Sequence, residues 1–463
     1  MPPEEFRKYG HEIVDWIADY LSNPEQYPVL PQRSPGQLVD SLPSHGPEQP
    51  EPMDAILADF YSKIIPANTF WNHPGFMAYF STTGSPPAIL AELLISTLNV
   101  NAMLWKSSPA ATELEQVTLA WLRDWLGLSN DYVGVIFDTA STSTMHAIAA
   151  ARFAAAPETR DRGSLPKMTI YTSEQAHSSI EKGAMAIGVG RNNVRKVPAD
   201  HEFRMRPELL ETMIEQDRKA GLQPFCVAPS IGTTSTSSID PLEPILRIAE
   251  KYRLWVHVDG AYGGSAGIIP EMRDTLGPYW LADSLVVNPH KWLGTGLDLS
   301  ILYTRRPDSL KGAYSLNAEY LRTIEDPRLV NYMDYGVPLG RRFRALKLWF
   351  VMRAYGRRKL QEILSQHIHW ARELAEEIRK DNRFEVSAGV PLSLVCFRYR
   401  GTDEENKQLL ERINETGEFF LSHTVVNGKL ILRLALGNFF AERRHLDRVW
   451  HLIRSLVPEP AAI

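Results

Sequence analysis

The sequence has few cysteines and no large excess of charge. Only two of its 463 residues are cysteines, Cys226 and Cys396, and both lie in apolar runs. Thiols in such runs are usually small buried hydrophobes, so we expect no disulfide and a reducing compartment, the cytoplasm. The formal net charge is −5, from 55 acidic and 50 basic side chains. This balance gives no basic face, and we expect no nucleic-acid partner.

The sequence also lacks membrane segments and clusters of metal ligands. No apolar run approaches the ~18 residues that a bilayer-spanning helix needs. The first residues, Met1-Pro-Pro-Glu-Glu-Phe6, show no charged-then-apolar signal pattern, so we expect no membrane partner. Among the 13 histidines, the closest approach to a ligand pair is His367 and His369. Their spacing puts them on different faces of a helix, and we expect no metal.

The beginning of the chain reads as a helix followed by an arm. At 463 residues the chain exceeds one ordinary domain of roughly 100–200 residues. Apolar residues from Phe6 to Leu21 recur near helical spacing, Asn23-Pro24 ends the helix, and residues 24–52 are proline-rich and extended. Such a segment buries little against itself. We interpret residues 1–85 as a helical arm that clasps a second copy of the chain, with packing on its own subunit as the alternative.

The middle of the chain alternates apolar runs with helical stretches. The predicted strands are Val133–Phe137, Met168–Thr172, Pro224–Ala228, Leu254–Val258 and Ser284–Val287. Helices are predicted between them, around 142–153, 178–186, 207–220 and 241–252. This pattern indicates an α/β domain over 86–345, with a mainly parallel sheet covered on both faces.

The pattern of predicted helices and strands changes near residue 346. A long helix, Leu346–Lys380, is predicted to precede strands at Phe384–Val386, Leu392–Tyr399 and Leu430–Ala435, and a last helix is predicted near 441–457. These elements indicate a smaller α/β domain over 346–463.

An acid and a lysine follow two neighbouring predicted strands. One strand ends at Asp259, and 284–287 runs into Asn288-Pro-His-Lys291-Trp. Ligands bind beyond the carboxyl ends of strands in such sheets. The pair suits pyridoxal phosphate (PLP), because the acid pairs with the pyridinium nitrogen and the lysine forms a Schiff base. The alternative, a structural ion pair, would be costly to bury for no evident gain.

Three other strand ends carry polar residues. His177 follows 168–172 and could stack on the pyridine ring, although a lone loop histidine is often only a surface residue. The segment 138–144 opens a helix with hydroxyls and free amides, which bind phosphate well, although ordinary N-capping needs only one of them. The segment 231–235, which contains Thr234, offers hydroxyls after strand 224–228.

Taken together, these motifs resemble the PLP-dependent group II amino-acid decarboxylases, in the aromatic L-amino-acid decarboxylase branch. The resemblance rests on Asn288–Trp292, with His257-Val-Asp259 upstream, and on four further blocks. These blocks are Glu5-Phe6-Arg7, the segment from His73-Pro74 to Ala78-Tyr79-Phe80, Ser108–Glu115 and Pro338–Arg344. It implies PLP fold type I, which is aspartate-aminotransferase-like. That fold has a mainly parallel seven-stranded sheet between helices and a small C-terminal domain. It also implies a homodimer with active sites at the subunit interface.

The resemblance also implies roles for individual residues. Lys291 matches the lysine that carries the cofactor, Asp259 the pyridinium partner and His177 the stacking imidazole. The matched cofactor-binding positions are Ala140, Ser141, His177, Thr234, Asp259, Ala261, Asn288, His290 and Lys291. The matched substrate-binding positions are Trp71, Tyr79, Phe80, Thr82, Asn101, Met103 and Gly340, of which Asn101 and Met103 would come from the second subunit.

Tyr320 lies in a polar segment, 315–332, that lacks a clear period and predicts a loop. From the residues alone it would be an ordinary loop tyrosine. By resemblance it matches the general acid that protonates the α-carbon after decarboxylation. Aldehyde synthases of the family carry phenylalanine there, so Tyr320 together with His177 favours simple decarboxylation.

Several positions depart from the family pattern and leave the substrate open. They include Ser81, Asn101, Met103 and Asp138, whose carboxylate we expect to point away from a phosphate. By resemblance, Gly340 matches a position where glycine, in place of serine, goes with room for an indole ring in plant members of the family. This favours tryptophan or 5-hydroxytryptophan and leaves phenylalanine, tyrosine and DOPA open. The alternatives are an aromatic acetaldehyde synthase, a decarboxylase for a non-aromatic acid such as histidine or glutamate, and a PLP-binding protein without turnover. The aromatic block 71–80 argues against glutamate.

Overall fold

The computed structural model describes residues 1–163, 167–316 and 329–458. Contacts between residues divide the chain into two compact units. The first unit comprises Met1–Ser81, Glu377–Glu385 and Phe397–Ile463, and the second comprises Thr82–Glu376 and Val386–Cys396. The three domains drawn from the sequence stay a prediction. Within the described residues, no helix has both the length and the apolar character needed to cross a membrane. Cys226 and Cys396 are both free and buried.

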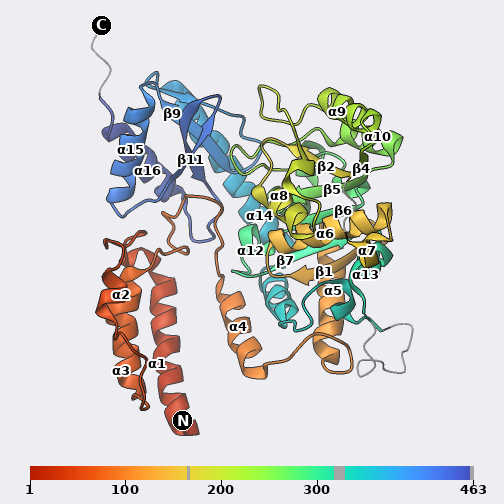
Figure 1. Cartoon of the computed structure of the whole chain (residues 1–463). Helices are drawn as coiled ribbons and strands as arrows, with labels where there is room; N and C mark the ends of the chain where they lie inside the picture. Colours follow the sequence, from red (N-terminus) through yellow and green to blue (C-terminus); the bar gives the residue numbers. More distant parts are fainter. Residues whose placement is uncertain (164–166, 317–328, 459–463) are drawn as a thin grey trace. The chain divides into compact units, whose positions relative to one another are not determined.

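The second unit contains a seven-stranded sheet with the order β1-β7-β6-β5-β4-β2-β3 (Figure 1). The strands are β1 (Val133–Phe137), β2 (Met168–Ser173), β3 (Val194–Val197), β4 (Gln223–Ala228), β5 (Trp255–Gly260), β6 (Ser284–Val287) and β7 (Ser300–Thr304). Only β7 runs against its neighbours β1 and β6. The carboxyl ends of the other six strands therefore lie at one edge. This confirms the mainly parallel sheet, although β3 and β7 were not among the predicted strands.

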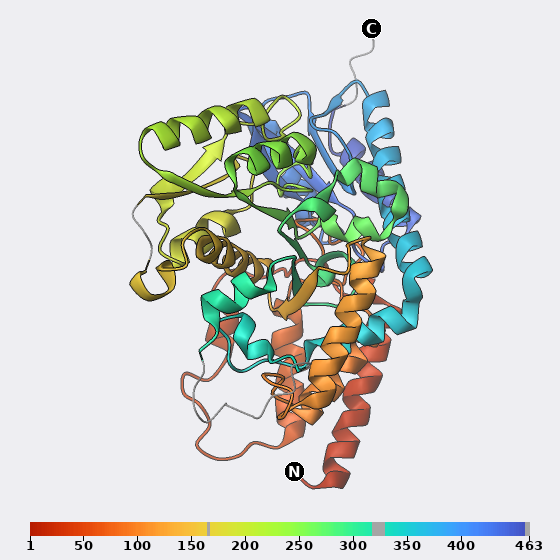
Figure 2. The same ribbon diagram turned by 90° about the vertical axis from the view of Figure 1, so that its right-hand side faces the viewer.

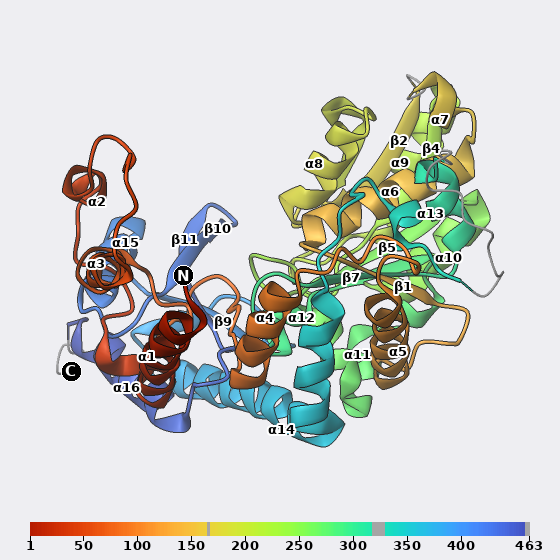
Figure 3. The same cartoon turned by 90° about the horizontal axis from the view of Figure 1, so that it is seen from below.

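Helices cover both faces of this sheet. Every residue of β2, β5, β6 and β7 is buried, as continuous apolar runs require. On one face α6 (Ala140–Ala155) lies across β1 and β4 to β7, with α8 (Ser178–Ala186) and α13 (Pro307–Tyr314) packed on it. Gly183 permits the approach of α8, because a Cβ there would lie 3.2 Å from Met145 Cα. Gly134 on β1 faces Leu119 of α5 (Pro109–Trp125), so α5 covers the opposite face (Figure 3).

The remaining helices of the second unit include one long helix with a break. α14 spans Arg344–Lys380, but Gly356 has φ 65° and ψ 169°, and the helix changes direction (Figure 3). The prediction of one continuous helix was therefore wrong at Gly356, since glycine adopts this left-handed φ without strain. α9 (Pro207–Lys219) and α10 (Leu242–Tyr252), green in Figure 2, pack side by side. The others are α4 (Pro86–Leu98), α7 (Thr159–Arg162), α11 (Arg273–Leu276) and α12 (Pro289–Trp292).

The first unit begins with α1 (Pro3–Ser22), the predicted N-terminal helix. The segment 24–52 is not extended throughout, because it forms a 3₁₀ turn at Pro24–Gln26 and a short helix α2 (Gln37–Ser41), followed by α3 (Met53–Asp59). Glu25 fixes this segment on α16 (Arg443–Ser455) by accepting hydrogen bonds from Arg444 at 2.7 Å and Arg448 at 2.8 Å. α15 spans Asp403–Glu415.

A second, four-stranded sheet has the order β10-β11-β9-β8. Its strands are β8 (Phe384–Val386), β9 (Leu394–Tyr399), β10 (Ser422–Val426) and β11 (Lys429–Ala435). β10 and β11 form an antiparallel hairpin, and β10 is the one strand of the four that was not predicted. Its burial alternates along its length, which exposes two of its five residues, His423 and Val425, and weakens its apolar signal.

Candidate active site

Lys291 and Asp259 lie at the ends of two adjacent strands. Asp259 is on β5, directly opposite Val286 of β6. Lys291 lies five residues after Val286, in α12. Burial lowers the pKa of the Lys291 ammonium below its ordinary value, and the negative charge of Asp259 opposes this effect. A lysine with a lowered pKa more readily presents a neutral amine, which is the nucleophilic form.

The turns after β5 and β6 are connected through Ala261. Its N–H donates to Asp259 Oδ1 at 3.1 Å, and its carbonyl accepts from Asn288 N at 3.2 Å. Asp259 is only 8% exposed, and Asn288 is 1% exposed. Asn288 Oδ1 accepts no hydrogen bond from any residue within the described ranges. Because buried polar atoms in native proteins almost always have partners, this amide is suited to a bound ligand.

His177 shares this site with Lys291 and Asp259. It is the N-cap of α8, and its Nδ1 accepts from Ser179 N at 3.1 Å, so a neutral ring carries its proton on Nε2. Burial lowers the pKa of His177, the Asp259 carboxylate raises it and Lys291 lowers it further. These mutual effects show that the three side chains, predicted from three strand ends, lie within electrostatic range of one another.

The start of α6 is open to an anion. Ala140 and Ser141 form its first turn, Ser141 is exposed, and no side chain of the described residues caps the helix. The first N–H groups of such a helix point outward and favour negative charge. Asp138 accepts a hydrogen bond from Thr139 N at 2.6 Å, which occupies its carboxylate in its own turn.

Two further predicted cofactor residues flank this region. His290 is buried, and its Nδ1 accepts from Leu299 N at 3.0 Å. Burial, with the positive charge of Lys291, lowers the pKa of His290 to about 3, so the ring is neutral and its Nε2–H can donate. Thr234 is exposed in the turn after β4, which is closed by a hydrogen bond from Ser237 N to Thr233 O at 2.8 Å.

These side chains together form a set that fits PLP. A carboxylate at Asp259 suits the pyridine nitrogen, a lysine with a lowered pKa suits the aldehyde, and an imidazole at His177 suits the ring. The open start of α6 suits the phosphate. Asn288 Oδ1, a buried acceptor with no donor among the described residues, is the observation of this structure that most directly indicates a missing polar partner, which would be a donor.

In the second unit, three of the predicted substrate residues lie in one cluster. Asn101 Oδ1 accepts from Arg341 N at 2.9 Å, directly beside Gly340, and Asn101 Nδ2 lies 3.5 Å from Met103 Sδ. A Cβ at Gly340 would meet nothing within 4 Å, so the space beside it is open. Thr82, the first residue of this unit, is half-buried.

In the first unit, the other predicted substrate residues belong to an aromatic cluster. Trp71 stacks on Phe76, with ring centroids 4.2 Å apart, and lies 6.1 Å from Tyr79. The guanidinium carbon of Arg433 lies over the Phe80 ring, 5.6 Å from the ring centroid. Tyr79 is 52% exposed and has a φ of 51°, so the chain turns sharply where it presents this ring.

A buried ion pair supports the Asn101 cluster and was not predicted from the sequence. Arg341 donates to Glu115 through two nitrogens, at 2.7 and 3.1 Å, and also to the carbonyls of Ala102 and Ile136. Glu115 is 2% exposed and also accepts from Ile136 N. Glu115 and Arg341 belong to two of the blocks on which the family resemblance rests. The one signal in the sequence that could have indicated the pair is the charge of Glu115 at a helix position where an apolar residue is expected. Tyr320 lies outside the described residues.

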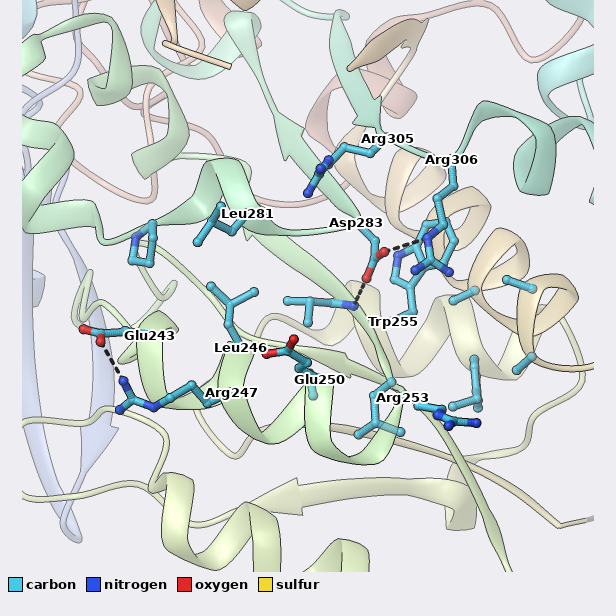
Figure 4. A pocket seen from close by; sticks show the side chains of 18 residues that line it. Glu243, Leu246, Arg247, Glu250, Arg253, Trp255, Leu281, Asp283, Arg305 and Arg306 are labelled. Carbon is cyan, nitrogen blue, oxygen red and sulfur yellow. Dashed lines mark hydrogen bonds and ion pairs between the residues drawn. The ribbon is translucent and has the colours of Figure 1, made fainter. Parts of the chain in front are cut away.

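A surface pocket of about 820 Å³ lies elsewhere in the second unit, at the opposite ends of β5 and β6 (Figure 4). It is lined by α10 and by residues at the start of those strands, and the pair Asp283–Arg306 crosses it at 2.8 Å. None of the predicted cofactor or substrate residues lines it. Its size therefore carries no argument about the chemistry at Lys291.

Comparison with known proteins identifies relatives over nearly the full chain. Residues 35–400 match the pyridoxal-dependent decarboxylase conserved domain. The chain is 40% identical to phenylacetaldehyde synthase of Petunia hybrida, over 98% of this chain and 94% of that protein. It is 39% identical to aromatic-L-amino-acid decarboxylase of Catharanthus roseus, with the same coverage. The crystal structure of Oryza sativa TDC with PLP and tryptamine superimposes with a TM-score of 0.95, at 36% identity and 98% coverage of both chains.

Proposed function

Because the chain belongs to the pyridoxal-dependent decarboxylase family, we propose that it removes the carboxylate of an aromatic L-amino acid and releases the aryl amine and CO2. The observation that carries the proposal is the grouping of Lys291, Asp259 and His177 beyond the carboxyl ends of β6, β5 and β2, within electrostatic range of one another. The aromatic substrate class is supported by relatives named for it.

Each residue of this group has a proposed task. PLP, when bound, supplies an electron sink for the electron pair left by the departing CO2. Lys291 Nζ, with its lowered pKa, presents a neutral amine to the cofactor aldehyde. The Asp259 carboxylate would keep a proton on the pyridine nitrogen, and the His177 ring would lie against the pyridine. The N–H groups of Ala140, Ser141, Asn288 and His290 would hold the phosphate. Thr234 and Ala261 would make the other contacts.

The proton delivered to the α-carbon after CO2 leaves is assigned to the Tyr320 hydroxyl. This assignment rests on the sequence, because Tyr320 lies outside the described residues. A tyrosine at this position, with histidine at 177, favours amine release over aldehyde formation. The aldehyde synthase is the second candidate, since a relative at 40% identity bears that name.

An assay of both products separates the two candidates. The purified protein is supplied with tryptophan, 5-hydroxytryptophan, phenylalanine, tyrosine, DOPA and histidine, and amine, aldehyde and peroxide are measured together. We expect amine without peroxide from the wild-type protein, and aldehyde with peroxide from Tyr320→Phe. If the wild-type protein forms peroxide and aldehyde in proportion to the substrate it consumes, the result would favour the synthase. If histidine is the one amino acid of the panel that it turns over, the aromatic assignment would be contradicted.

We also propose a homodimer and a cytoplasmic location. α4 exposes Leu90, Leu93, Leu94 and Leu98, whose spacing puts them on one helix face and leaves apolar area for a second copy. Asn101 and Met103 follow this helix directly and would enter the partner's site. Light scattering should give twice the 52.4 kDa chain mass, and Leu94→Glu should lower it. A monomer at assay concentrations would contradict the dimer. The free thiols of Cys226 and Cys396 support the cytoplasm.

A further inference from the structure

A buried histidine lies beneath the start of α6, on the strand that carries Asp259. His257 is two residues before Asp259 on β5, so both side chains lie on the same face of the strand. His257 is completely buried. Its Nε2 lies 3.4 Å from Thr144 Oγ1 in the second turn of α6. The histidine therefore joins β5 to the helix whose first residues are Ala140 and Ser141.

Both ring nitrogens of His257 have a hydroxyl partner. Nδ1 lies 2.9 Å from Ser284 Oγ, which also accepts from the Trp255 indole N–H at 2.8 Å. Because a hydroxyl can donate or accept, Thr144 Oγ1 is a partner of Nε2 in either neutral tautomer. Burial lowers the pKa of His257 to about 4, against the opposing effect of Asp259, so the ring is neutral at neutral pH.

A neighbouring contact strengthens the connection between sheet and helix. Ser143 Oγ lies 2.7 Å from Ser300 Oγ on β7, so consecutive residues of α6 are tied to two different strands. Of these two contacts, the one through His257 starts from the strand that holds Asp259. Removal of this tie would leave α6 attached to the sheet through Ser300 and apolar packing, but free to shift relative to Asp259.

We propose that His257 is a positioning residue that sets the spacing between Asp259 and the start of α6. These are the groups that would hold the ring nitrogen and the phosphate of PLP, and the inference rests on the cofactor roles proposed above. PLP is a compact ligand anchored at both ends. Anchors that are preset at its length bind it more tightly, because no binding free energy is spent on moving them.

The test compares three variants by their PLP affinity and their thermal stability. His257→Phe keeps a ring but removes both hydrogen bonds, and Thr144→Val removes the hydroxyl partner of Nε2 at nearly constant volume. Trp255→Phe is the matched control, since it changes the same hydrogen-bonded chain outside the link between β5 and α6. The equilibrium dissociation constant of PLP is measured by reconstitution of the cofactor-free protein, whose melting temperature is measured separately.

We expect His257→Phe and Thr144→Val each to weaken PLP binding about ten-fold, the order expected for one lost hydrogen bond. The double variant should bind PLP no more weakly than His257→Phe alone, because that change already removes the bond to Thr144. His257→Gln should recover part of the affinity, since its amide can replace Nε2 as the hydrogen-bond partner of the Thr144 hydroxyl. Trp255→Phe should lower the melting temperature and change PLP affinity less than about two-fold.

Unchanged PLP affinity in folded His257→Phe protein, with only a lower melting temperature, would reduce His257 to a core residue and overturn the inference. If His257→Phe does not fold, Thr144→Val decides in the same way. A wild-type protein that binds no PLP would instead refute the proposed function itself, so the two failures are distinguishable.

Discussion

The buried pair Glu115–Arg341 allows a quantitative prediction about stability. The carboxylate accepts two hydrogen bonds from Arg341, at 2.7 and 3.1 Å, and one from Ile136 N at 2.9 Å. Glu115→Gln keeps the shape but removes the charge and one acceptor atom, so the guanidinium stays buried without a counter-charge. Removing one partner of a buried pair costs about 3–5 kcal/mol. The glutamine oxygen keeps part of the bonding, so we expect about 3 kcal/mol.

The matched control is Glu243→Gln in α10. Glu243 accepts a hydrogen bond from Arg247 at 2.6 Å, but both side chains are well exposed, and such pairs contribute about 0.3–0.5 kcal/mol. Urea unfolding of the cofactor-free protein, followed by tryptophan fluorescence, gives the two midpoints. A Glu115→Gln midpoint that falls no further than that of Glu243→Gln would refute this reasoning about the buried charge.

Two further predictions concern the substrate and pH. Gly340→Ser should raise the KM for tryptophan more than that for phenylalanine, without loss of stability, because the new Cβ meets no atom within 4 Å; equal changes for both substrates would contradict a role for Gly340 in indole binding. Burial lowers the pKa of His146 to about 4, below its unfolded value of about 6.5, so the unfolded state binds more protons in this window. Stability should therefore fall as pH drops from 6.5 towards 4, and His146→Phe should reduce that slope by up to about 1.4 kcal/mol per pH unit in urea titrations; an unchanged slope would contradict a neutral His146.

The sequence predicted the buried strands best. Val133–Phe137 and Ser284–Val287 match β1 and β6 residue for residue, because both are short apolar runs bounded by polar residues. β3 was missed because two of its four residues, Arg195 and Lys196, are charged. β7 was missed because it follows β6 closely and runs against it, which the alternation of strand and helix does not predict.

The candidate site was predictable where chemistry depends on residue type at a strand end. Asp259, His177 and Lys291 were singled out in this way, and the structure brings them within electrostatic range, while their roles stay a prediction. The supporting contacts were not predictable. His257 and Glu115 were quoted within longer motifs and given no role of their own. A buried polar residue is recognised by its hydrogen-bond partner, and the partners of these two, Thr144 and Arg341 respectively, lie far away in the sequence.

The attachment of PLP to Lys291 is the central claim, and it has a direct measurement. The protein is loaded with PLP, reduced with borohydride to fix any Schiff base, digested and analysed by mass spectrometry. The account predicts a phosphopyridoxyl group on the peptide containing Asn288–Trp292, at Lys291, and its absence from Lys291→Ala protein. Stoichiometric label on a different lysine, or protein that binds PLP without any reducible bond, would contradict it.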